Sequence, residues 1–306
     1  MHHNLSRLPA FLLLSIGLAL PTGLAAQTKK VVQSTNYPLH YFAQRLAGAS
    51  FQLDYIVDPE EDPAFWKPDT EAIAAFQKAD IVLKNGADYE KWMERASLRR
   101  APLVDTSKAF SSNFIQVEGK EHRHGDGTVH SHAGTAYTTW IDFSQAAQQA
   151  QAVAARFRQT DPADAAAIDE RLSALMGELA ELNGRMKAFG TAWGDKPLVA
   201  SHPIYHYLAR AYGLAIEPLE WEPDMEMEES DLADLKALLK KHPAKWMIWE
   251  EEPTPENVAA IAELGVGSVV FDPCANLPEE GDWLSMMQAN VEAFENLLAL
   301  PSDPQD

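Results

Sequence analysis

Short runs of β-forming residues alternate with helix-forming segments along most of this chain, and this alternation limits the fold more than any other sequence feature. In the first half, the β-like runs cover residues 31–36, 51–57, 80–85 and 103–106, with helical patterns at 37–47, 70–79 and 89–96. The second half repeats this order, with runs at 198–201, 216–221, 246–251 and 268–272 and helical patterns at 203–212, 231–241, 255–264 and 283–300. Such alternation is typical of βα units on a parallel sheet. The sequence therefore predicts an α/β fold with two doubly wound parallel-sheet lobes.

Between the two halves, residues 142–189 are nearly all good helix formers, with one break at Asp161–Pro162. Beyond the break, apolar residues recur at intervals of three and four and form one seam: Ile168, Leu172, Leu175, Leu179, Leu182 and Met186. A helix over residues 163–189 would be roughly 40 Å long, enough to span both lobes. A short interaction coiled coil is the alternative. We favour a connecting helix, which divides the chain into lobes at 27–141 and 191–306 and linking helices at 142–190.

The first 26 residues have the pattern of a secretory signal peptide. They carry one charge, Arg7, before an apolar run at 10–20 and a stretch of small residues ending at Ala26. The run is too short for an ordinary transmembrane helix, and a buried N-terminal helix is the alternative. The single cysteine, Cys274, can form no internal disulfide. We therefore expect an exported, periplasmic monomer without stable membrane insertion.

The charge balance restricts the partners of the protein. Asp and Glu number 45 against 25 Lys and Arg, which gives a formal net charge of -20. Such a surface repels the phosphate backbone of nucleic acids. We therefore expect no nucleic-acid partner, and a cationic ligand fits the charge better.

Two α/β lobes joined in this way leave a cleft at the carboxyl ends of their strands, where open α/β sheets bind ligands. Two residues that follow predicted strands can ligate a metal, His202 and Asp272. A single histidine at a strand end is more often a hydrogen-bonding residue than a ligand. The two positions together still make the cleft the first place to look for a metal.

Four of the ten histidines, His122, His124, His130 and His132, lie in the segment 121–132. The glycines and the lack of an apolar period predict a flexible loop. Neutral imidazole is a common ligand for Zn²⁺, and His-x-His pairs on a mobile loop can close on an ion. A solvated polar loop that binds nothing is the alternative, but we interpret the cluster as a metal-contacting segment.

Several segments in fixed order resemble the zinc/manganese solute-binding proteins of metal ABC importers. The resemblance covers nearly all of the chain after residue 26. It is carried by residues 36–48, Asp62–Pro63, 77–80, 85–86, the histidine-rich loop with 140–142, residues 201–202 with 207–214, and 270–273. It implies two lobes joined by a long helix. It also implies that the protein captures Zn²⁺, with Mn²⁺ as the alternative ion, and delivers it to an ABC permease.

The resemblance implies four ligand positions, of which this chain fills two. His202 and Asp272 occupy the third and fourth positions, whereas Ala64 and Thr138 stand where the family usually has histidines. Two protein ligands alone would leave zinc half coordinated by water.

The missing ligands can be replaced in several ways. We favour the loop, which can supply His130 or His132. Other interpretations use an acidic residue at 60–62, which suits a harder ion such as Mn²⁺, or the additional histidines His40 and His206. A last interpretation is a metal chelate bound between Trp66, Trp140 and Trp221.

Catalysis has little support in the sequence. The chain contains no His-Glu-x-x-His, no nucleophile elbow and no phosphate loop. We therefore predict a binding protein rather than a metal-dependent hydrolase. A periplasmic metal buffer or chaperone shares the same features, so the sequence does not separate it from an importer component.

Overall fold

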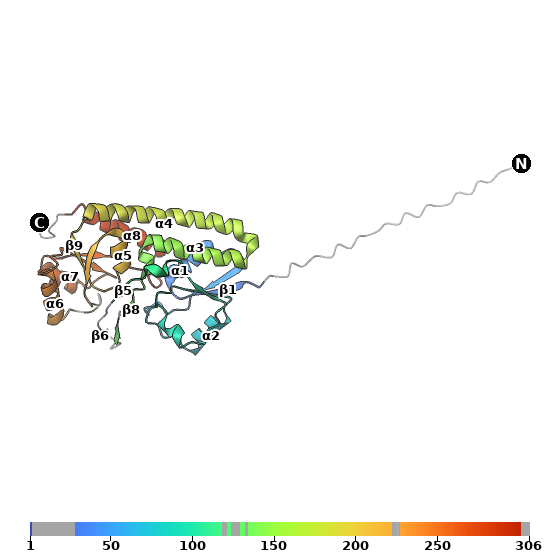
Figure 1. The fold of residues 1–306 in the computed structure, drawn as a ribbon, viewed down its shortest axis with the longest axis horizontal. Coiled ribbons are helices and arrows are strands. Elements are labelled where there is room, and N and C mark those ends of the chain that lie inside the picture. The colour runs from blue at the N-terminus through green and yellow to red at the C-terminus, as the bar shows by residue number, and fades with distance from the viewer. Residues whose placement is uncertain are drawn as a thin grey trace.

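The structure is a computed structural model that describes residues 28–117, 134–221, 225 and 227–300, together with Met1 and the backbone of 121–123 and 129–131. Two four-stranded sheets lie side by side, and a long helix runs over both of them (Figure 1). Within the described residues, no helix combines the length and apolar character needed to cross a bilayer.

The first sheet contains β1 (Lys30–Ser34), β2 (Phe51–Asp54), β3 (Ile81–Lys84) and β4 (Leu103–Asp105), in the order β2-β1-β3-β4. All neighbouring strands are parallel. The chain moves outward from β1 to β2 and then back past β1 to β3. Right-handed crossovers therefore place α1 (Tyr37–Leu46) and α2 (Thr70–Lys78) on opposite faces of the sheet.

The second sheet repeats this topology. Its strands are β9 (Pro197–Ala200), β10 (Ala215–Pro218), β11 (Trp246–Trp249) and β12 (Gly267–Val270), all parallel and in the order β10-β9-β11-β12. The helices that connect and follow them are α5 (His206–Tyr212), α6 (Glu229–Leu239), α7 (Pro255–Ala262) and α8 (Trp283–Leu297). The predicted pair of doubly wound α/β lobes is therefore confirmed.

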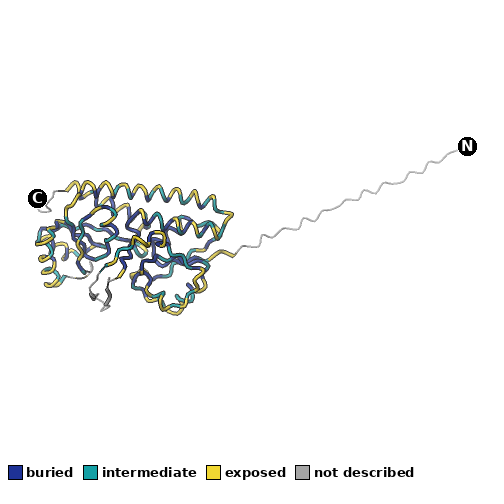
Figure 2. Tube along the Cα trace, viewed as in Figure 1, coloured by how far each residue is buried: buried dark blue, intermediate teal, exposed yellow. Residues whose placement is uncertain are grey.

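The predicted long helix that joins the two lobes is also confirmed. α3 (Phe143–Thr160) and α4 (Ala165–Trp193) form a hairpin, and Pro162 begins the short 3₁₀ turn Pro162–Asp164 between them. The 29 residues of α4 correspond to about 44 Å. All members of the apolar seam are buried except Leu172, which is half-buried, and α4 presents its exposed side to solvent (Figure 2). The seam packs against the lobes of this chain, so no coiled-coil partner is needed to cover it.

One continuous hydrophobic core runs through both lobes. It includes Val32 and Phe42 of the first lobe, Leu179 of α4, and Ile248 and Phe294 of the second lobe. Two smaller clusters lie apart from it, one under α2 around Phe76 and one under α6 and α7 around Trp249.

The prediction of a helix at 89–96 is wrong for most of these residues. Only the 3₁₀ helix Lys91–Glu94 forms there. The preceding turn uses positive φ angles at Gly86, Ala87 and Asp88. The Glu90 carboxylate accepts hydrogen bonds from the backbone N–H groups of Asn85 and Gly86. These bonds fix Glu90 in the turn, and α-helical geometry does not develop.

The described parts of the segment 121–132, residues 121–123 and 129–131, form two short strands where a flexible loop was predicted. β6 (Glu121–Arg123) pairs antiparallel with β7 (Val129–Ser131), and the backbones of His122 and His130 lie directly opposite each other. Backbone pairing needs no apolar period, which is why the sequence pattern did not show it. His124 and His132 lie outside the described residues. β5 (Gln116–Val117) and β8 (Gly134–Thr135) form a second short antiparallel pair that brackets this hairpin.

Candidate metal site

His202 lies just beyond the carboxyl end of β9 and is almost completely buried. Its Nδ1 is 3.1 Å from the carbonyl oxygen of Trp221 and 3.4 Å from Oε1 of Glu250. A carbonyl oxygen can only accept a hydrogen bond, so Nδ1 carries the proton and donates it. The lone pair is then on Nε2. This is the tautomer that a metal-binding imidazole needs, with its second nitrogen oriented by a carbonyl and a carboxylate.

The sheet topology places Glu250 between His202 and Asp272. Because β11 lies between β9 and β12, the residues that follow these three strands meet along one edge of the sheet. Two strand spacings separate the backbones of His202 and Asp272 by about 10 Å. Side chains pointing toward each other from these positions can approach a common ion.

Asp272 is held in a fixed orientation by its neighbours. Its Oδ1 accepts a 2.6 Å hydrogen bond from the backbone N–H of Cys274. The Asn290 side chain of α8 accepts from its N–H at 3.0 Å and donates to its carbonyl oxygen at 2.6 Å. Burial raises the pKa of Asp272 from 3.8 to about 6, against the effect of the Cys274 N–H. Burial therefore disfavours the ionised form of the carboxyl group, and a bound cation would offset the free-energy cost of ionising it.

Asp62 brings a carboxylate from the first lobe to the same region. Its Oδ1 accepts a 2.8 Å hydrogen bond from the backbone N–H of Ala64. Asp62 is an exposed residue. The surrounding protein nevertheless raises the pKa of its carboxyl group by desolvation, an effect that the Ala64 N–H and the proximity of His202 oppose. The two groups therefore lie close enough to interact electrostatically.

The loop that carries Asp62 is tied to the second lobe by one asparagine. The Nδ2 of Asn276 donates to the carbonyl oxygens of Asp58 and Glu61, both at 2.7 Å. Its Oδ1 accepts from the hydroxyl of Tyr55 at 2.8 Å. Asn276 therefore acts as a latch between the loop after β2 and the loop after β12.

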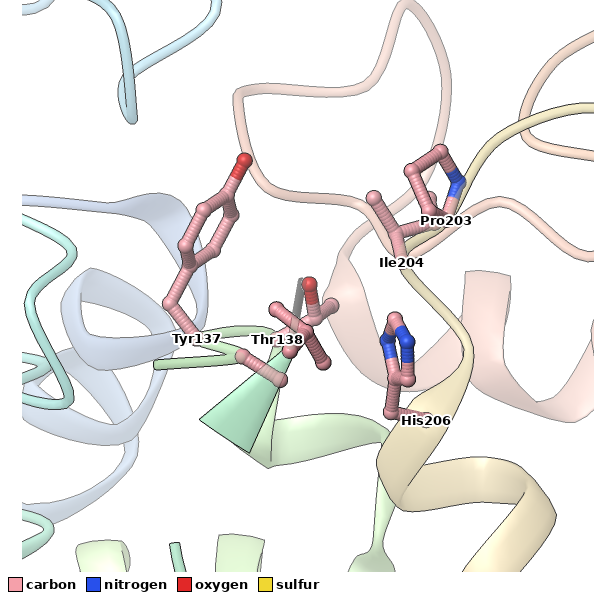
Figure 3. Close-up of a pocket in the computed structure, with 7 residues that line it drawn as sticks. Tyr137, Thr138, Pro203, Ile204 and His206 are labelled. Atoms are coloured by element: carbon pink, nitrogen blue, oxygen red, sulfur yellow. The ribbon is translucent and has the colours of Figure 1, made fainter. Parts of the chain in front are cut away.

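The two positions that the family resemblance marks as altered are both buried, and neither replaces a histidine. Ala64 has no donor atom in its side chain. Thr138 lines a small cavity together with Tyr137 from its own lobe and Pro203, Ile204 and His206 from the other lobe (Figure 3). The cavity has room for about one water, roughly 10 Å³. Here His206 faces Thr138 across the lobe boundary.

The other alternative ligands do not join His202. His40 packs against the rings of Tyr37 and Tyr55, with ring centroids 6.4 and 5.3 Å away. Burial lowers the pKa of His40 from 6.5 to about 4, an effect that nearby Asp54 opposes. It is a neutral packing residue of α1.

The proposed aromatic cage is wrong. Trp66, Trp140 and Trp221 belong to three separate hydrophobic clusters. Trp140 also donates its indole N–H to the carbonyl oxygen of Pro273 at 2.7 Å. The three rings are used for packing, each in its own core.

Among the residues whose side chains the structure describes, no three His, Cys, Asp or Glu groups are placed so that they could hold a metal ion together. Within this part of the chain, His202, Asp62 and Asp272 therefore do not form a coordination shell. The side chains of His122, His124, His130 and His132 lie outside the described residues.

Glu250 is the residue that sequence reasoning missed as part of the site. It lies in the predicted run 246–251 and directly follows β11 in the structure. Its position beside His202 depends on the pairing of β9 with β11, a contact between residues far apart in the sequence. Asp62 was one of three acidic candidates, and it is the one whose pKa is affected by His202.

Comparison with known proteins gives consistent results. The family model described as "Zinc-uptake complex component A periplasmic" matches residues 32–297. The high-affinity zinc uptake system protein ZnuA of Bacillus subtilis is 25% identical over 286 residues, which cover 89% of this chain and 88% of that protein. The zinc-binding lipoprotein AdcA of Streptococcus pneumoniae is 26% identical over 291 residues, or 88% of this chain, and this chain spans 56% of its length. Among solved structures, the metal-dependent lipoprotein YcdH of Bacillus subtilis has the same fold, with a TM-score of 0.74 at 22% identity over 88% of this chain and 98% of that one.

Proposed function

This chain belongs to the family of periplasmic zinc-uptake components, and from this premise we propose that it captures Zn²⁺ between its lobes and delivers it to an ABC permease. Members of this family are solute-binding proteins rather than enzymes. The proposal accordingly assigns no catalytic step to the site. We also propose that the protein is a monomer and has no nucleic-acid partner. A separate metal buffer or chaperone would share the site and differ only in lacking the permease.

The setting of His202 is the observation that carries the proposal. Its Nδ1–H is directed to the Trp221 carbonyl, with the Glu250 carboxylate beside it. A carboxylate on the far nitrogen of a ligating imidazole orients the ring and increases its basicity. We assign Glu250 this orienting role and Nε2 of His202 the role of ligand.

We propose Asp62 and Asp272 as the oxygen ligands, one from each lobe. Because the described side chains do not surround a common point, these groups would have to move together when the ion binds. The pKa of each is raised chiefly by desolvation, so both carboxylates gain from a nearby cation. One imidazole and two carboxylates leave a fourth position of tetrahedral zinc to be filled. His122, His124, His130 and His132 remain the predicted source of that ligand. Because two of the three donors are oxygens, Mn²⁺ is the alternative cargo.

Binding should weaken as the pH falls. Zinc ligation requires a neutral imidazole and ionised carboxylates. Protons therefore compete with the ion at about pH 6, where Asp272 titrates. Zinc affinity is expected to be nearly constant above pH 7 and to decrease steadily below pH 6.

Zinc calorimetry of the metal-free full chain tests the assignment. His202→Gln is expected to abolish the tight site. His242→Gln is the matched control. Like His202, His242 has a ring nitrogen bonded to a backbone carbonyl, here Nε2 at 2.9 Å from the carbonyl oxygen of Leu198. Among the described contacts, His242 has no acidic neighbour from the other lobe. If His202→Gln binds zinc as tightly as wild type, the site is assigned wrongly.

A second experiment separates delivery from buffering. Solubilised permease from the same organism should retain the zinc-loaded protein on an affinity column. If the permease does not retain it and zinc uptake continues in cells lacking the protein, delivery is wrong and buffering is correct.

A further inference from the structure

A second, larger cavity lies beside His202, between α5 and the edge strand β10. Its volume is about 310 Å³, which is at the lower end of the range for small-molecule sites. Most of the lining is apolar and includes Ile115, Leu214 and Ile216. A single hydrated ion needs far less room and no apolar walls.

Arg210 is the one cationic side chain in the described lining of this cavity, which contains no acidic side chain. The other polar residues of the lining are His202, Tyr205 and His206, and burial lowers the pKa of His206, which favours its neutral form. A cation without an acidic neighbour is unusual in a chain with 45 acidic and 25 basic residues. Such a lining favours an anionic ligand.

Arg210 is held in place by two contacts. Its Nη1 donates to the carbonyl oxygen of Asn113 at 2.5 Å, and its guanidinium lies 4.9 Å from the centroid of the Tyr207 ring. The bond to Asn113 uses one of the five N–H donors of the guanidinium. The remaining geometry suits a carboxylate, which arginine binds in two parallel hydrogen bonds.

The cavity and the incomplete metal site share one wall, formed by His202. The described residues supply too few ligands to surround zinc, whereas a chelating carboxylate brings its own nitrogen or oxygen donors. We propose that this cavity binds a small chelating carboxylate with an apolar or aromatic body, so that zinc is held as a mixed complex between His202 and this organic ligand. The inference rests on the proposed function and adds an organic ligand to the zinc ion that the protein is proposed to carry.

Retention of L-histidine, used as the probe, tests the proposal. Wild-type full chain is incubated with Zn²⁺ and L-histidine, passed through a desalting column and analysed by mass spectrometry after denaturation. About one histidine per protein is expected in the presence of zinc and none without it. Citrate, which chelates zinc but has no apolar body, is expected to be retained at least tenfold less. Equal retention of both, or of neither, would overturn the proposal.

Substitutions in the cavity give the second arm. Ile216→Trp fills the space and should abolish histidine retention, while Glu217→Trp, on the exposed face of the same strand, should not. Arg210→Gln keeps the cavity open and should weaken retention about tenfold, the effect of losing a charged hydrogen bond. Unchanged retention in both cavity variants would show that the ligand binds elsewhere.

Two controls separate this inference from the proposed function. Calorimetry with zinc alone should give the same binding for wild type and Ile216→Trp. If zinc binds through His202 but no histidine is retained, only the mixed complex is wrong. If histidine is retained only after deletion of residues 121–132, the chain's own segment fills the cavity and the proposal is also wrong.

Discussion

Replacing Asp272 with asparagine is expected to stabilise the metal-free protein and to weaken zinc binding. The asparagine Oδ1 can still accept the hydrogen bond from Cys274, so the change removes the charge and little else. Burial raises the pKa of Asp272 from 3.8 to about 6. In the folded protein the carboxyl group therefore holds its proton more tightly than in the unfolded chain.

The sign and size of the effect follow from this difference. A carboxyl group with a raised pKa costs nothing well below pH 3.8, where both states are protonated, and its full cost is reached above pH 6. At 1.36 kcal/mol per pH unit, the difference between 3.8 and about 6 corresponds to at most about 3 kcal/mol. Removing the charge recovers this free energy only in the metal-free state, because bound zinc neutralises the carboxylate.

Urea denaturation of chelator-treated protein measures the effect. At pH 7.5 Asp272→Asn should be more stable than wild type by up to about 3 kcal/mol, and at pH 4 the two should differ by less than about 1 kcal/mol. Excess zinc should stabilise wild type strongly and the variant only slightly. A metal-free variant that is less stable than wild type at pH 7.5, or equal zinc stabilisation of both, would refute the reasoning.

Three further predictions concern other parts of the molecule. Asn276→Ala should accelerate zinc release to a chelator in stopped-flow experiments, because the loop that carries Asp62 loses its latch; an unchanged rate would contradict the latch. The contribution of His40 to stability should fall by up to about 3 kcal/mol as the pH falls from 6.5 to 4, because burial lowers the pKa of His40 to about 4 and protonation is then coupled to unfolding. The difference in stability between wild type and His40→Phe, measured by urea titration at each pH, should change by this amount. Leu179→Ala, in the fully buried seam of α4, should cost about 3 kcal/mol in the same assay, and Leu172→Ala, at a half-buried position, clearly less.

The sequence predicts the architecture well because the alternation of strands with helices and the apolar spacing of α4 are both local patterns. The αβ alternation, the break at Pro162 and the buried seam of α4 can all be read from neighbouring residues, and the structure confirms them. The family match confirms the prediction that the chain is a metal-binding solute-binding protein. Residues 2–27, which contain most of the predicted signal peptide, lie outside the described residues, and that prediction stays open to test.

The site is harder to predict because its parts meet through long-range contacts. Glu250 reaches His202 only because β9 and β11 pair, and Asp62 is positioned by a loop that Asn276 holds from 215 residues away. The tryptophan cage failed for a related reason. Sequence position shows that an aromatic residue follows a strand but not which core it enters.

Because the hydrophobic core is continuous across both lobes, we expect the two lobes to unfold together. Phe42, Leu179 and Phe294 belong to one uninterrupted apolar interior, so neither lobe can melt without exposing surface that the other covers. The predicted divisions at 141/142 and 190/191 are accordingly not expected to bound autonomous folding units, and the second of them falls inside α4, which ends at Trp193. A fragment cut at either boundary would leave the underside of α4 facing water and should aggregate, whereas the intact chain should denature in one cooperative transition.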